Sequence, residues 1–152
     1  MSEVFGKPVE GQVQHYSSEP VEQAHPNVLR DALDSLFELP NVKSVRWEQY
    51  TPYFNDGDAC EFNIYDAKIL VSGAAEDAGD YEDGYMDTYD FKYRADTLGD
   101  IDNLEELTRR FSLVSAEIAG GQHFIFLKQS FGDPAQVTAT REGFSIEFYD
   151  HD

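Results

Sequence analysis

An acidic run in the middle of the chain constrains the fold more than any other feature. Residues 73–91 hold seven carboxylates and no lysine or arginine. Like charges this close repel one another and are costly to bury, so the segment has to lie on the surface. Its glycines Gly73, Gly79 and Gly84 favour a loop over a helix. We therefore expect an acidic loop at residues 73–90.

The composition outside this run predicts one folded domain spanning residues 1–152. The chain has 11 phenylalanines, nine tyrosines and one tryptophan, whereas disordered chains are poor in aromatic residues. A chain of this length can bury about 70% of the surface that it exposes when unfolded. Residues 1–24 lack a hydrophobic period and contain several prolines and glycines, so we expect an irregular N-terminal arm there.

The net charge narrows the classes of partner. Thirty acidic and 11 basic residues give −19, and residues 73–102 hold ten of the acids but only two of the bases. A compact chain of this length is about 35–40 Å across, and duplex DNA of that length carries about 20 charges. Self-repulsion therefore opposes direct binding to nucleic acid, whereas a basic nucleic-acid-binding protein would be attracted. Solubility and adaptation to a salty cytoplasm are the alternative explanations of the acidity.

Cysteine use and hydropathy indicate the compartment. The single cysteine, Cys60, excludes an internal disulfide and favours a reducing environment. The chain shows no leader of basic then apolar residues, and its apolar runs fall far short of the ~20 residues that span a bilayer. We therefore expect a cytoplasmic protein with no membrane partner. The oligomeric state is left open.

Hydrophobic spacing predicts two helices. In the first, apolar residues recur at helical spacing after Pro26, which suits a first turn, and Pro40 ends the element. In the second, we expect Asp102 as the N-cap, with Glu105 as its capping-box partner. The Gly120-Gly121 pair then provides a left-handed exit.

Alternation of apolar and polar residues predicts strands around these helices. The segments expected as strands are residues 42–54, 60–65, 68–72, 87–94, 123–131, 136–140 and 144–149. Each helix is followed by hairpins rather than by a parallel crossover. The fold class expected is therefore α+β, with an antiparallel sheet of about five to seven strands and two helices packed on one face.

Motifs for catalysis and for metal binding are missing from the sequence. An EF-hand loop fails because the positions before Gly84 that need acids fall on Asp83, Tyr81 and Gly79. The four histidines are scattered and lack zinc-ligand spacing. There is no Gly-x-Ser-x-Gly elbow and no phosphate-binding loop. We therefore expect no enzyme activity, no cofactor and no metal.

Tyrosines spaced by four are threaded through the acidic run, and they suggest a binding surface. They would either pack the loop onto the core or present rigid aromatic anchors amid negative charge, a combination that suits arginine-rich partners. The candidate partner-binding residues are Glu76, Asp77, Asp80, Tyr81, Glu82, Asp83, Tyr85, Asp87, Tyr89 and Asp90.

Two segments resemble stretches of known sequences. Residues 47–58, Trp-Glu-Gln-Tyr-Thr-Pro-Tyr-Phe-Asn-Asp-Gly-Asp, and the ending at residues 143–152, from Gly-Phe through Tyr-Asp-His-Asp, are similar to stretches in a family of small, uncharacterised acidic proteins encoded by tailed bacteriophages. The resemblance covers about a third of the chain. It implies a phage accessory protein that acts in the cytoplasm of an infected bacterium, but it carries over no site residue.

These observations favour a binding protein over an enzyme. We expect a DNA-mimic-like inhibitor that occludes a cationic site on a basic host protein, either nucleic-acid-binding or defence-related. The alternatives are a protein that sequesters a small molecule or a metal, and a component of the virion or its assembly. Stabilisation by added ligands would favour the first alternative, and detection in virions would favour the second.

Overall fold

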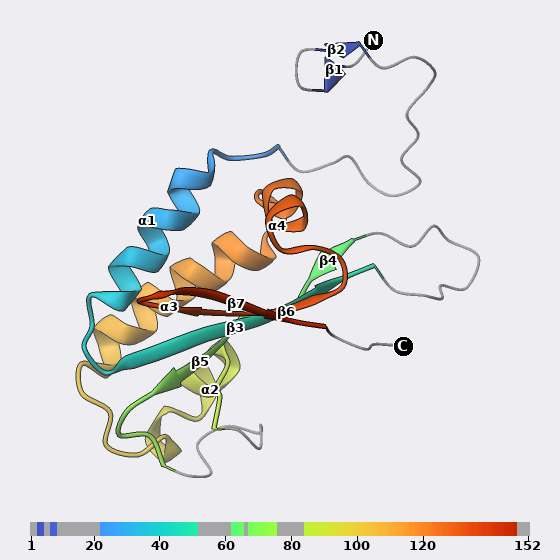
Figure 1. The fold of residues 1–152 in the computed structure, drawn as a ribbon. Helices are drawn as coiled ribbons and strands as arrows, with labels where there is room; N and C mark the ends of the chain where they lie inside the picture. Colours follow the sequence, from blue (N-terminus) through green and yellow to red (C-terminus); the bar gives the residue numbers. More distant parts are fainter. Residues whose placement is uncertain are drawn as a thin grey trace.

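The computed structural model describes residues 22–51, 62–65, 67–75 and 84–148, together with the backbone of one short strand pair near the N-terminus. Figure 1 shows the arrangement of the elements. In chain order they are β1 (Glu3–Val4), β2 (Lys7–Pro8), α1 (Pro26–Phe37), β3 (Val42–Tyr50), β4 (Asn63–Ile64), β5 (Lys68–Val71), α2 (Thr88–Tyr93), the 3₁₀ helix η1 (Ala95–Thr97), α3 (Leu104–Ala119), α4 (Phe124–Phe131), β6 (Ala135–Thr140) and β7 (Gly143–Glu147).

The main sheet is antiparallel and is built around β3. On one edge of β3 lies β6, which pairs with β7; on the other edge β4 and β5 pair with successive parts of β3. The expected α+β class with an antiparallel sheet is therefore confirmed, with five strands in this sheet. The described residues form four α-helices rather than the two expected. In Figure 1, α1, α3 and α4 lie on one side of the sheet and α2 lies beyond β5.

Helix α1 follows from its sequence. Pro26 occupies the first turn, and the Nδ1 atom of His25 accepts a hydrogen bond from the Asn27 N–H, which caps the helix. Leu29, Leu33 and Leu36 lie on its buried face. The predicted helix after Pro26 is confirmed.

Helix α3 differs from the prediction only at its start. Its N-cap is Asn103, in the left-handed region at φ 56°, and no side chain makes a capping hydrogen bond there. The capping box expected from Asp102 and Glu105 is therefore wrong. The predicted exit is confirmed in its position, because the helix ends at Gly120 and Gly121 has φ 97°.

Two segments expected as strands are helices. Residues 123–131 contain α4, and residues 87–94 contain α2. A short, densely apolar run cannot be assigned to helix or strand by its period, and the first segment is such a run. In the second, Asp87 caps the helix reciprocally with Asp90, and this local capping outweighs the alternation of Phe91 and Tyr93.

The buried amide of Gln49 ties β3 to α4. Its Nε2 donates to the carbonyl oxygens of Leu127 at 2.9 Å and Gly132 at 2.7 Å, and its Oε1 accepts from the Trp47 indole N–H at 3.0 Å. Gln49 and Trp47 have no exposed surface. The groups are fully satisfied, so burying them costs little, and α4 is held at a fixed place on the sheet.

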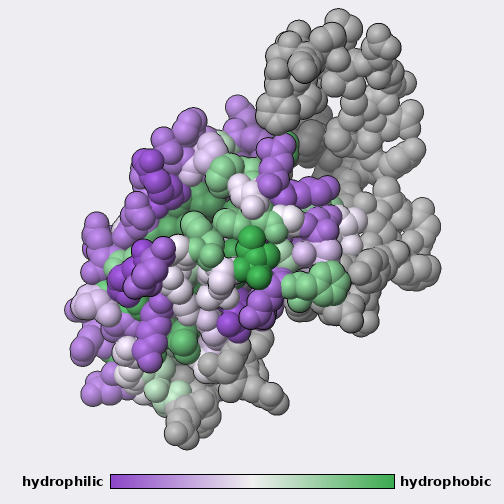
Figure 2. All heavy atoms as spheres, viewed as in Figure 1, coloured by the Kyte–Doolittle hydropathy of each residue, from purple (hydrophilic) through white to green (hydrophobic). Residues whose placement is uncertain are grey.

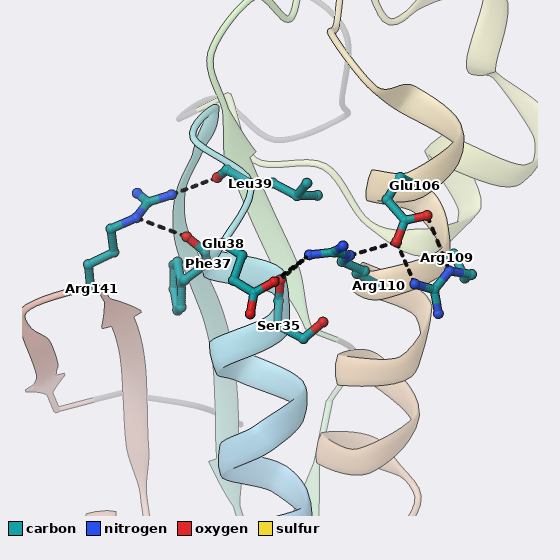
Figure 3. Close-up of polar contacts among 8 residues, drawn as sticks. All are labelled: Ser35, Phe37, Glu38, Leu39, Glu106, Arg109, Arg110 and Arg141. Atoms are coloured by element: carbon teal, nitrogen blue, oxygen red, sulfur yellow. Dashed lines mark hydrogen bonds and ion pairs between the residues drawn. The ribbon is translucent and has the colours of Figure 1, made fainter.

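Two arginines hold the C-terminal end of α1 from different elements (Figure 3). Arg141, in the turn between β6 and β7, donates to the carbonyl oxygens of Phe37, Leu39 and Val42. Arg110 of α3 donates to the Ser35 carbonyl at 2.7 Å and pairs with Glu38. Cations that satisfy the last carbonyls of a helix stabilise that end.

Replacing Arg141 tests this anchoring. We expect Arg141→Ala to lower the free energy of unfolding by about 1–2 kcal/mol, because three carbonyls lose a charged donor. Arg30→Ala is the control, since Arg30 is exposed and its ion pair among the described residues is with the exposed Asp31; its effect should stay within about 0.5 kcal/mol. Urea unfolding measures both, and equal effects would contradict the anchoring role.

Candidate protein interaction surface

A second acidic segment lies outside the predicted loop. Residues 96–105, here called the acidic turn, join η1 to α3 and contain no lysine or arginine. Leu98 and Ile101 are buried and fix the turn to the core. Its acidic side chains, all exposed, are Asp96, Asp100, Asp102 and Glu105.

The acidic turn is held against the beginning of the predicted acidic loop. The Ala75 N–H donates to the Leu98 carbonyl at 2.7 Å, and Ala74 forms an antiparallel bridge with Gly99. A Cβ at Gly99 would lie 2.5 Å from the Ala75 nitrogen, and φ at Gly99 is +100°. Only glycine lets two backbones approach this closely with such a φ. The chain up to residue 75 is therefore fixed against the acidic turn.

The chain re-enters the sheet edge after residues 76–83. Met86 forms an antiparallel bridge with Ile69 of β5. The Tyr85 hydroxyl lies 2.6 Å from Ser44 Oγ, and its ring lies under the Arg46 guanidinium at 4.3 Å. Tyr85 is buried, so it packs this end of the loop onto the sheet.

Asp87 and Asp90 serve the short helix α2. Each accepts a hydrogen bond from the backbone N–H of the other. Asp90 is buried and pairs with Arg94 at 3.3 Å. Burial raises the pKa of Asp90, against the opposing effect of the hydrogen bond from the Asp87 backbone. Both carboxylates therefore shape the helix.

Helix α2 presents two exposed tyrosines. Tyr89 and Tyr93 expose 57% and 62% of their surfaces, and their ring centroids lie 5.0 Å apart. With Thr108 and Ser112 of α3 they line a shallow groove of about 390 Å³. Lys92 lies over the Tyr93 ring at 5.2 Å. The same groove could therefore receive a guanidinium or ammonium from another protein.

The ten residues predicted from the sequence fall into three groups. Tyr89 is exposed and Asp87 is partly exposed, whereas Tyr85 and Asp90 are buried in internal contacts. The others lie outside the described residues: Glu76, Asp77, Asp80, Tyr81, Glu82 and Asp83. Sequence reasoning missed the acidic turn as part of the surface. The sequence did contain a signal for the turn, because the ten acids of residues 73–102 extend beyond the predicted loop, which ends at residue 90.

Cations in the described part of the chain mostly serve internal contacts. Residues 22–51, 62–65, 67–75 and 84–148 hold 16 acids and ten bases. Ion pairs within this part engage six of the bases: Arg30, Lys68, Arg94, Arg109, Arg110 and Lys128. The rest of the chain holds 14 acids and one base. The negative charge is thus concentrated in the other segments, of which residues 76–83 begin beside the acidic turn.

Within residues 22–51, 62–65, 67–75 and 84–148, no three His, Cys, Asp or Glu side chains are placed to hold a metal ion together. None of the helices in these ranges has the length and apolarity to cross a bilayer. No protein-family model, curated protein or solved structure matches this chain.

The contact between the acidic turn and residue 75 can be tested at Gly99. We expect Gly99→Ala to lower the free energy of unfolding by at least ~1 kcal/mol, because it adds a clash to an unfavourable φ. Gly132→Ala is a matched control: φ there is +97°, and an added Cβ meets no atom within 4 Å. Urea unfolding gives the difference in unfolding free energy between the two variants, which measures the effect of the clash between residue 99 and Ala75. Equal losses of stability in both variants would show that only the positive φ matters.

Glu106, near the start of α3, should make the free energy of unfolding depend on pH. Hydrogen bonds from Arg109 and Arg110 (Figure 3) lower the pKa of Glu106 to about 2, below the ~4.3 of an unfolded chain. Because Glu106 has a lower pKa in the folded chain than in the unfolded chain, its ionised form stabilises the fold above pH ~4.3. This contribution to the free energy of unfolding is lost as the pH falls from about 4.3 towards 2. Urea unfolding across this window should show a shallower loss for Glu106→Gln than for the native chain. Parallel pH profiles would contradict the pairing.

Proposed function

We propose that this chain is a non-enzymatic binding protein that covers a cationic site on a nucleic-acid-binding or defence protein. One observation supports the proposal most. The acidic turn is bonded to Ala74 and Ala75, and it directly follows the segment of α2 that carries the exposed Tyr89 and Tyr93. Figure 1 draws α2 and the turn together beside β5.

The acidic turn supplies the electrostatic part of recognition. Its four exposed carboxylates make no ion pair with any described residue. Such charges attract a cationic partner from a distance and speed the encounter. They are also screened over ~8 Å at physiological ionic strength. Binding should therefore weaken steeply as salt is added.

Tyr89 and Tyr93 supply the short-range part. Tyrosine loses little conformational entropy on binding and offers its ring face to arginine, which favours it at the centre of interfaces. The groove between α2 and α3 lies beside these rings. A partner arginine that enters it would lie near the acidic turn. The protein would then act by steric and electrostatic occlusion, in competition with nucleic acid.

The resemblance to small acidic phage proteins suggests where this would happen. In an infected bacterium, the available cationic sites belong to proteins that bind the host chromosome or the incoming phage genome. An accessory protein that covers such a site would keep the partner from nucleic acid. This setting is part of the proposal and does not alter the physical argument from charge and aromatic residues.

Charge-matched variants test the proposal. The full-length protein, immobilised, is exposed to bacterial lysate at low and raised salt, and the bound proteins are identified by mass spectrometry. We expect a basic nucleic-acid-binding protein that is released by salt and by competing duplex DNA. The test variant neutralises the turn by Asp96→Asn, Asp100→Asn and Asp102→Asn, and it should lose the partner.

The control variant changes the net charge equally, at exposed sites outside the turn. It carries Glu22→Gln, Asp31→Asn and Asp34→Asn, and it should retain the partner. A third variant, with Asp80→Asn, Glu82→Gln and Asp83→Asn, tests the adjoining segment in the same assay. Equal retention by all variants, or recovery of no basic protein at low salt, would refute the proposal.

A further inference from the structure

The apolar rows of the sheet continue onto the edge strand β7, which the described helices cover only in part. Val45, Ala139 and Phe144 are neighbours across β3, β6 and β7, as are Trp47, Val137 and Ile146. The members on β3 and β6 are at most 1% exposed, whereas Phe144 and Ile146 are 54% and 51% exposed. Phe148, next in the alternation, is 74% exposed. The helical layer therefore ends before β7 does.

A groove marks the border of this layer. Its volume is about 490 Å³, and α1, α4 and the hairpin of β6 and β7 line it. Phe131 of α4 contacts Phe144 with ring centroids 5.0 Å apart, and Phe126 of α4 also reaches the groove. Figure 2 shows hydrophobic side chains gathered on the face where α1, α4 and β7 meet. The exposed residues of β7 are thus part of a larger apolar patch.

Among the described strands, none pairs with the outer edge of β7. The hairpin has a two-residue turn that pairs Thr140 with Gly143. In such hairpins the closing residues bond to each other, so alternate residues direct N–H and C=O groups outward. On β7 these residues are Phe144 and Ile146, and Phe148 follows directly after the strand. No proline or lysine interrupts residues 143–148, although soluble proteins use such residues to protect exposed edges.

We propose that β7 pairs in antiparallel fashion with β7 of a second copy of this chain. The two-fold axis passes through Ile146, so that Ile146 faces Ile146 and Phe144 faces Phe148 of the second copy. This register joins the outward backbone groups of both strands. It also sets Glu147 opposite Ser145, so no like charges are directly opposed. The second copy's Phe148 then lies beside the groove.

The area fits a reversible dimer. A half-exposed Phe or Ile side chain presents about 100 Å², so the apolar side chains of Phe144, Ile146, Phe148 and Phe126 give roughly 400 Å² per copy. With the backbone edge and flanking polar groups, the total approaches about 1,200 Å², the lower end of specific interfaces. The dimer should therefore exchange with monomer in the micromolar range of chain concentration.

The charge of the chain does not prevent this pairing. The acidic loop begins beside β5, and the order β5, β3, β6, β7 puts β7 at the opposite edge of the sheet. Three strand spacings amount to about 14 Å, which exceeds the ~8 Å screening length at physiological ionic strength. The nearest like charges are the two Glu147 side chains, which are diagonal neighbours across the axis, and salt should strengthen the dimer because it screens their repulsion. Salt should weaken the proposed binding of a cationic partner, so the two proposals can fail independently.

Sedimentation equilibrium and light scattering test the dimer. From micromolar to near-millimolar chain concentration, the native protein should pass from 17.2 kDa to twice that mass, and it should do so at lower concentration in higher salt. Ile146→Glu puts two carboxylates at the axis and should raise the dimer Kd by at least about tenfold. Leu113→Glu, at an exposed apolar residue of α3, should leave the Kd unchanged.

Hydrogen exchange on the native chain provides a readout that needs no variant. The amide hydrogens of Phe144, Ile146 and Phe148 should exchange more slowly as chain concentration rises, while those of exposed loops should not change. A mass that stays at 17.2 kDa throughout would overturn the proposal. Association with exchange at β7 that is independent of concentration would overturn it as well, because the copies would then meet elsewhere.

Discussion

The buried side chain of Gln49 is the interaction on which the rest of the structure depends. A primary amide buried in a core must satisfy its donors and acceptor, and here the carbonyls of Leu127 in α4 and of Gly132 just after it, together with the Trp47 indole, do so. The position of α4 on the sheet follows from these bonds. The limit of the helical layer, the groove beside it and the exposed side chains of β7 follow in turn.

Local signals predicted part of this architecture. The leucines after Pro26 have a clear helical period, and α1 forms there. The final hairpin forms where alternation indicated it, at β6 and β7. By contrast, residues 124–131 are apolar on nearly every side, so their period could not separate helix from strand. Their helix is specified by bonds to Gln49, which is distant in sequence, and no local pattern contains that information.

The candidate surface was predictable to a similar extent. The charge of residues 73–102 indicated its general place, but individual side chains depended on packing. Tyr85 and Tyr89 are the same residue type and lie four residues apart in sequence. Tyr85 is nevertheless buried beneath Arg46, whereas Tyr89 is exposed on α2. Likewise the contact of Ala75 with Leu98 joins segments more than 20 residues apart. It requires Gly99, whose role could not be recognised without coordinates.

The acidic residues 76–83 are bounded by two fixed points. On one side Ala75 is bonded to Leu98, and on the other Met86 is bridged to Ile69. Each anchor is formed by residues outside the segment. Insertions or deletions between the anchors would therefore leave the neighbouring backbone in register. The length and sequence of this segment can therefore vary while the core stays the same.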